Sequence, residues 1–152
     1  MVKKVDNTRA LNAGFKKAIR IKDTAIQSAF RAVLSATIED AVAKHNYDNQ
    51  TYNLENSYGW AIYHNHVMIE SDVKGAGDGA TRAHAFLSSY LSFHDWEGVV
   101  IAGAKYAKEL EGYVRRSDGF LSKSGDELFV LGKFFDYHSA GFIETLKSLA
   151  RL

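Results

Sequence analysis

The sequence predicts a single α+β domain over residues 1–152, with a long N-terminal helix, a small antiparallel β-sheet, an inserted helix and a C-terminal helix. Three observations lead to this fold class. Apolar residues recur at helical spacing up to Lys44, apolar and small residues alternate from Ser57, and helical spacing returns after Thr81 and again after Ser139. The length agrees, because 152 residues are the size of one ordinary domain.

The N-terminal helix is expected from about Thr8 to Lys44, a stretch without proline. Its apolar residues follow a spacing near 3.6, and they are Leu11, Phe15, Ile19, Ile26, Phe30, Val33 or Leu34, and Ala41. A continuous helix of this length spans about 55 Å, which is more than a compact domain of this size needs. We therefore expect either a break near Lys22–Thr24 or packing of the N-terminal part, with Leu11 and Phe15, on a neighbouring subunit.

The sheet is predicted from three short apolar runs. In SYGWAIYH, Tyr58, Trp60 and Ile62 alternate with small residues, which predicts a strand that is buried on one face only. NHVMIES is the expected return strand after a short turn around His64–His66, and EGVVIAG is a third strand bounded by glycines.

The remaining segments are predicted as loops and helices. KGAGDGA is a flexible loop, TRAHAFLSSYLSF a helix over residues 81–93, and SAGFIETLKSLARL a helix over residues 139–152. KYAKELEGYV fits a strand or a helix. The segment from Tyr113 to Glu127 is an exposed loop, which we expect to be mobile in the free subunit. Its Arg115 and Arg116 are candidate contacts for a phosphate or an acidic partner, or else belong to a solvated loop.

The composition excludes several classes of function. With 19 basic and 18 acidic residues the net charge is +1, which argues against wholesale nucleic-acid binding. The absence of cysteine removes disulfides, zinc thiolates and thiol nucleophiles. No apolar run approaches the roughly 20 residues of a membrane span, and the N-terminus lacks the apolar segment of a signal peptide, so we expect a soluble chain.

One pattern suggests metal chemistry. His64 and His66 stand two apart, so on a strand both imidazoles would point to the same face and bind a metal with Glu70 or Asp72. That pattern would suit a small metal-dependent hydrolase, whereas exposed histidines in a hairpin turn are the plainer interpretation. GAGDGA lacks the lysine of a phosphate-binding loop, and no serine stands in G-x-S-x-G. We therefore assign no catalytic residue and expect no cofactor or metal.

Two segments resemble a known family. DNQTYNLENSYGW is similar to the helix-to-strand corner of phage tail-component proteins, known as head–tail joining, neck or tail-completion proteins. Downstream, GVVIAGAKYAKELEGY resembles the same family's strand followed by a Tyr-Ala-x-x-aliphatic-Glu element. The residues that match the two patterns are Asp48, Thr51, Asn53, Leu54, Ser57, Tyr106, Ala107, Leu110 and Glu111. Their side chains favour a structural corner rather than an active site, because Asp, Thr and Asn can cap a helix end.

The resemblance implies a virion structural protein without enzymatic activity. It implies a homo-oligomeric ring, hexameric or dodecameric, in the neck between the head connector and the tail of a bacteriophage. The expected partners are further copies of the chain, the adjacent connector (portal-side) and tail proteins, and DNA that passes through the channel without specific binding. No membrane or cofactor is implied. A phage-encoded binding module directed at a host protein is the third hypothesis, and it would be monomeric.

Overall fold

The computed structural model describes residues 8–44, 54–105, 107, 114–115, 121–122 and 132–150. The architecture is α+β, as predicted. The main elements, in chain order, are α1 (Thr8–Lys44), β1 (Tyr58–His64), β2 (Val67–Val73), α2 (Asp78–Ser89), β3 (Trp96–Ala102) and α4 (Gly132–Ala150). A short 3-10 turn, η1 (Glu55–Ser57), precedes β1, and the short strands β4 (Val114–Arg115) and β5 (Leu121–Ser122) pair separately.

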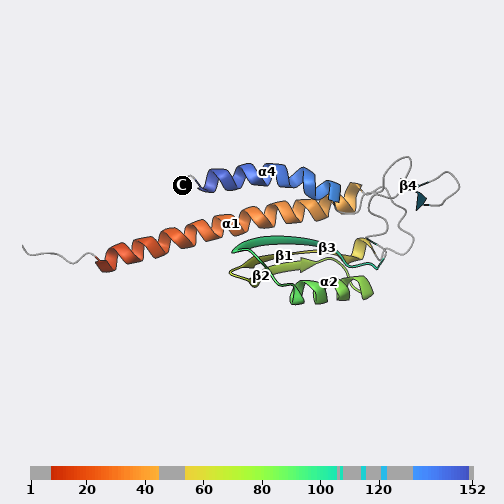
Figure 1. The fold of residues 1–152 in the computed structure, drawn as a ribbon, viewed down its shortest axis with the longest axis horizontal. Helices are drawn as coiled ribbons and strands as arrows, with labels where there is room; N and C mark the ends of the chain where they lie inside the picture. Colours follow the sequence, from red (N-terminus) through yellow and green to blue (C-terminus); the bar gives the residue numbers. More distant parts are fainter. Residues whose placement is uncertain are drawn as a thin grey trace, which may run out of the picture.

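The molecule has three layers. The antiparallel sheet has the order β2-β1-β3, so that β1 is central and pairs along its length with both neighbours. Helix α1 lies over one face of the sheet, α4 runs along α1, and α2 covers the other face (Figure 1). In the register, Trp60 of β1 lies opposite Asp72 of β2 and Val100 of β3.

The core lies on both sides of β1. The larger cluster fills the space between the sheet, α1 and α4, and consists of Phe30, Leu34, Ile38, Ala41, Leu54, Tyr58, Trp60, Ile62, Ala104 and Ala107. On the opposite face, Ala61 and Tyr63 pack against Leu87 of α2. The expectation that this strand is buried on one face only is wrong, because α2 covers the face that the sequence left to solvent.

Helix α1 has the predicted bounds and is continuous. The break considered near Lys22–Thr24 does not occur, and Thr24 Oγ1 donates to the carbonyl of Arg20 at 2.9 Å within the helix. At its C-terminal end α1 is joined to α4 by Asp40, which contacts Lys44 Nζ at 2.8 Å and His138 Nε2 at 2.9 Å. The hydrogen bonds from Lys44 and His138 lower the pKa of Asp40, against a smaller opposing effect of burial.

Three boundaries differ from the prediction. Helix α2 begins at Asp78 and ends at Ser89, where residues 81–93 were expected, because Tyr90 is already extended with φ −66° and ψ 131°. Half of the predicted GAGDGA loop is therefore helical. Helix α4 begins at Gly132, earlier than the predicted Ser139. Arg115 was expected in a loop and instead belongs to the short strand β4.

Among the described residues, no helix has the length and apolar character needed to cross a membrane.

Candidate assembly interface

The N-terminal part of α1 projects away from the rest of the protein. Residues 11–22, here called the overhang, are exposed throughout, and the helix runs past both the sheet and the end of α4 (Figure 1). Four large apolar side chains of the overhang are in solvent: Leu11 is 60%, Phe15 59%, Ile19 60% and Ile21 62% exposed, and the first three lie on one side of the helix. Exposed apolar surface of this kind usually marks an interface.

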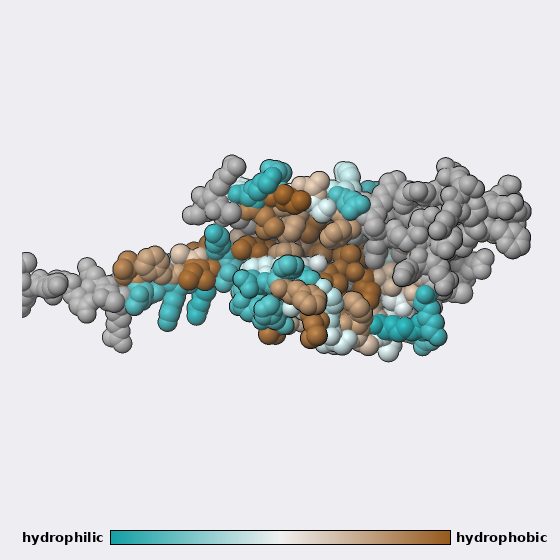
Figure 2. Space-filling model, viewed as in Figure 1, coloured by the Kyte–Doolittle hydropathy of each residue, from teal (hydrophilic) through white to brown (hydrophobic). Residues whose placement is uncertain are grey.

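The exposed side chains continue the stripe by which α1 packs on the sheet. At about 100° per residue, Leu11, Phe15 and Ile19 lie on the same side of the helix as Ile26 and Phe30. Phe30 is buried against Trp96 and Phe142, with ring centroids 6.0 and 4.6 Å away. Figure 2 shows apolar side chains continuing along the projecting helix, with polar side chains extending from its lower edge. The same stripe is thus core in one half of α1 and surface in the other.

The overhang is also strongly basic. It carries Lys16, Lys17, Arg20 and Lys22 and no acidic residue. Lys17 and Arg20 line a surface hollow together with Ile21 and Thr24. A partner that covers the apolar stripe therefore meets positive charge beside it.

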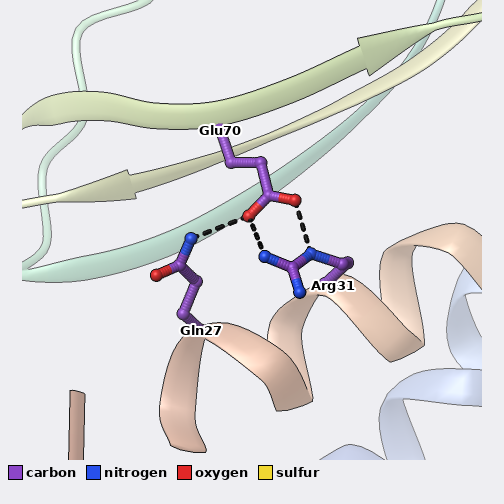
Figure 3. A network of polar contacts seen from close by, with 3 residues as sticks. All are labelled: Gln27, Arg31 and Glu70. Atoms are coloured by element: carbon purple, nitrogen blue, oxygen red, sulfur yellow. Dashed lines mark hydrogen bonds and ion pairs between the residues drawn. The ribbon is translucent and has the colours of Figure 1, made fainter. Parts of the chain in front are cut away.

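A polar network holds α1 to the sheet at the base of the overhang (Figure 3). Glu70 of β2 accepts hydrogen bonds from Gln27 Nε2 at 2.7 Å, from Arg31 Nη2 at 2.6 Å and from Arg31 Nε. The hydrogen bond from Arg31 lowers the pKa of Glu70, against an opposing effect of partial burial. Because the network ties the helix to an edge strand, it sets the direction in which the overhang leaves the domain.

A second exposed apolar surface, formed by two side chains, lies in the segment that connects α2 to β3. In the 91/93 loop, here residues 90–95, Leu91 is 77% and Phe93 76% exposed, while Ser92 between them is only 8% exposed. Glu97 accepts hydrogen bonds from Tyr90 OH, from Ser92 Oγ at 2.9 Å and from the Phe93 amide at 2.9 Å. Burial raises the pKa of Glu97, but these hydrogen bonds outweigh it and leave that pKa lowered.

The β1–β2 turn fixes the same loop from the other side. The amide of Asn65 donates to the carbonyl of Asp95 at 2.8 Å, and His66 Nδ1 lies 2.9 Å from the carbonyl of Ser92. Sequence reasoning missed this loop, because YLSF was taken as the end of a helix. The apolar–polar–apolar order around Ser92 was the signal that could have identified an extended segment.

The structure separates the two histidines that suggested a metal site. Strand β1 ends at His64, and Asn65 and His66 form the turn with φ of 50° and 65°, so the pair lies at a hairpin turn, as the plainer interpretation had it, and does not share a strand face. The imidazole of His64 stacks on Trp96, with ring centroids 4.0 Å apart. Glu70, the suggested third ligand, is bound to α1. In the part of the chain that is described, no group of three or more His, Asp or Glu is arranged to hold a metal ion.

The two segments that carried the family resemblance meet at Ser57. Its hydroxyl donates to the carbonyl of Leu54 at 2.7 Å and accepts from the amide of Ala104 at 3.1 Å, and its carbonyl accepts from the amide of Gly103. Leu54 and Ala107 are buried in the larger core cluster. These contacts give Ser57 a structural role at the corner between η1 and β1.

Several predicted residues lie outside the described ones. They are Asp48, Thr51, Asn53, Tyr106, Leu110, Glu111 and Arg116. Apart from β4 and β5, the predicted loop from Tyr113 to Glu127 lies outside them as well.

Comparison of the chain with protein-family models, with curated proteins and with solved structures gives no match.

Proposed function

We propose that this protein is a structural subunit of a homo-oligomer, held together by the overhang of α1. The observation that supports the proposal is the continuity of the α1 stripe. The side chains of Phe30 and Leu34 bury their apolar surface within the chain, whereas Leu11, Phe15 and Ile19 have the same chemistry and remain in solvent. Each large apolar side chain gains about 1.5–3 kcal/mol on full burial, so three together are a substantial driving force for association.

The overhang projects from one end of the subunit, and this position favours head-to-tail assembly. Its contact joins two different surfaces, and such heterologous contacts produce a closed ring when the rotation between neighbours closes. The overhang extends beyond the domain by several helical turns, so it reaches a neighbour without displacing any core element of its own chain. Ring formation needs no catalytic group, and none is assigned.

We further propose that the ring belongs to the neck of a tailed bacteriophage, as a tail-completion or head–tail joining component of the virion. This step depends on the resemblance of the corner around Leu54 and Ser57 and of the segment around Ala107. The adjacent partners would be the connector and the tail proteins. The nearly balanced net charge of +1 suits a channel that lets DNA pass without holding it.

Native mass spectrometry and electron microscopy of the purified protein test the ring. We expect one closed species with a fixed number of copies, six or twelve, that appears as a ring in projection. A chain that stays monomeric at high concentration, alone and with the adjacent neck proteins, would contradict the proposal and favour a monomeric binding module.

The location in the virion needs a separate experiment. Mass spectrometry of purified particles of a phage that encodes this chain should detect it in particles with joined heads and tails. Its absence from complete particles would contradict the neck assignment and leave self-assembly untouched.

A further inference from the structure

We propose that the overhang of one copy docks on the 91/93 loop of the next copy. This inference depends on the proposed self-assembly and names the surface that receives the overhang. Leu91 and Phe93 are the most exposed large apolar side chains among the described residues, and they belong to the segment between α2 and β3 rather than to α1. A contact between the two surfaces therefore joins unlike parts of two copies, as a ring requires.

The 91/93 loop is ordered by hydrogen bonds within its own chain and does not need a partner for its conformation. Glu97 binds three donors of the loop, and the β1–β2 turn binds the carbonyls of Ser92 and Asp95. A surface that is already ordered loses little conformational entropy on binding. Large side chains presented in this way resemble the anchor residues that carry most of the energy of an interface.

The charges of the two surfaces are complementary. Residues 54–73 and 83–104, which contain the sheet and the 91/93 loop, include no lysine or arginine. Their acidic residues are Glu55, Glu70, Asp72, Asp95 and Glu97, of which Glu70 already binds Arg31 and Glu97 already binds donors of its own loop. The overhang carries four cations and no acid. Pairing of two overhangs would bring like charges together, whereas docking on the sheet side of another copy brings unlike charges together.

The chain already makes a contact of this type within itself. Lys16 and Arg20 of the overhang lie on the same side of α1 as Gln27 and Arg31, at about 100° per residue. Gln27 and Arg31 bind Glu70, while Phe30 beside them packs on Trp96, the first residue of β3 after the 91/93 loop. The overhang thus repeats, about three turns earlier, the apolar row and the polar row by which α1 fits an apolar and acidic sheet surface.

Site-directed cross-linking tests the contact directly, because the natural chain has no cysteine. One preparation carries Phe15→Cys, the other Phe93→Cys with a mass tag, and the two are mixed and treated with a short bismaleimide. We expect the mixed 15–93 product to dominate over 15–15 and 93–93 products. A control preparation with Tyr137→Cys, on the exposed side of α4, should give little mixed product with Phe15→Cys.

Complementation of two variants provides the second test. Leu11→Glu/Phe15→Glu removes the overhang stripe, and Leu91→Ser/Phe93→Ser removes the receiving surface. We expect each to be monomeric alone, with an unchanged circular dichroism spectrum, and their mixture to give a 1:1 heterodimer that weakens as salt is added. The heterodimer forms because one chain keeps its overhang and the other keeps its loop.

The outcomes separate this inference from the proposed function. If the overhang variant is monomeric while Leu91→Ser/Phe93→Ser assembles like the wild type, self-assembly stands and the 91/93 loop is not the receiving surface. A dominant 15–15 product would likewise overturn the inference in favour of paired overhangs. A monomeric wild type would overturn both.

Discussion

Arg31 of α1 and Glu70 of β2 face each other with two parallel hydrogen bonds, from Nε to Oε1 and from Nη2 to Oε2. This two-pronged arrangement is the strongest geometry for a guanidinium–carboxylate pair. The pair stands between the part of α1 that packs on the sheet and the part that projects. The Arg31–Glu70 pair therefore stabilises the domain and also helps to fix the direction of the overhang.

Replacing Glu70 by Gln should destabilise the domain at neutral pH, because Arg31 loses its charged partner. We expect a lower midpoint of urea denaturation. We also expect a slightly smaller fraction of oligomer, because the overhang is held less firmly. Asp72→Asn is the matched control, with the same loss of charge on the same strand. Equal effects of the two substitutions would show that the Arg31 pair contributes nothing specific.

The effect of Glu70→Gln should depend on pH. The hydrogen bond from Arg31 lowers the pKa of Glu70 in the folded state. A lowered carboxyl pKa contributes stability that is complete above the unfolded-state value, about 4.3, and is lost as the pH falls through the folded-state value. The difference in unfolding free energy between wild type and variant should therefore be largest near pH 7 and shrink below pH 4.3. If the difference in unfolding free energy instead increased as the pH falls, the effect could not come from the lowered pKa of Glu70.

Ser57 should be a structural residue whose loss weakens the corner. In Ser57→Ala the buried amide of Ala104 loses its acceptor, which costs about 1–3 kcal/mol of unfolding free energy. Ser71→Ala, at an exposed position on β2, is the control and should change stability little. Urea denaturation of both variants provides the measurement, and a neutral Ser57→Ala would remove the case for a structural corner.

Replacement of glycine by alanine should lower the stability of the protein at Gly103 and raise it at Gly141. A Cβ at Gly103 would lie 2.1 Å from the carbonyl oxygen of Gly79, so α2 must move to accept it. We expect Gly103→Ala to destabilise the domain by about 1–3 kcal/mol or more. At Gly141 of α4 nothing lies within 4 Å of the added carbon. There Ala should stabilise the helix by about 0.5–1 kcal/mol, and thermal unfolding distinguishes the two.

The elements that depend on local periodicity were predictable. The bounds of α1 follow from its spacing, and β1 and β2 follow from alternation around a two-residue turn at Asn65 and His66. What local sequence did not reveal was packing between distant segments. Gly98 looks like a strand boundary, yet it lies within β3, where a Cβ would come within 2.7 Å of the ring of Phe30, so that the position favours glycine for packing and not as a strand end.

The candidate interface was predicted in part. Leu11 and Phe15 were identified from helix length alone, because a helix longer than its domain leaves apolar residues unpaired. The 91/93 loop was missed because its shape depends on Glu97, a residue that follows it in sequence and binds three of its donors. The histidine pair failed as a site because the backbone turns between its members.

The most direct test of assembly through the overhang is the mass of the protein in solution, measured by sedimentation velocity from low to high concentration. Three chains are compared: the wild type, Leu11→Glu/Phe15→Glu, and Ile21→Glu, which adds a charge at an exposed site about 200° around the helix from Ile19. We expect the wild type and Ile21→Glu to form the same oligomer and the double variant to remain a folded monomer. If the double variant forms the wild-type oligomer, or if the wild type is itself monomeric throughout, the overhang is not an assembly surface.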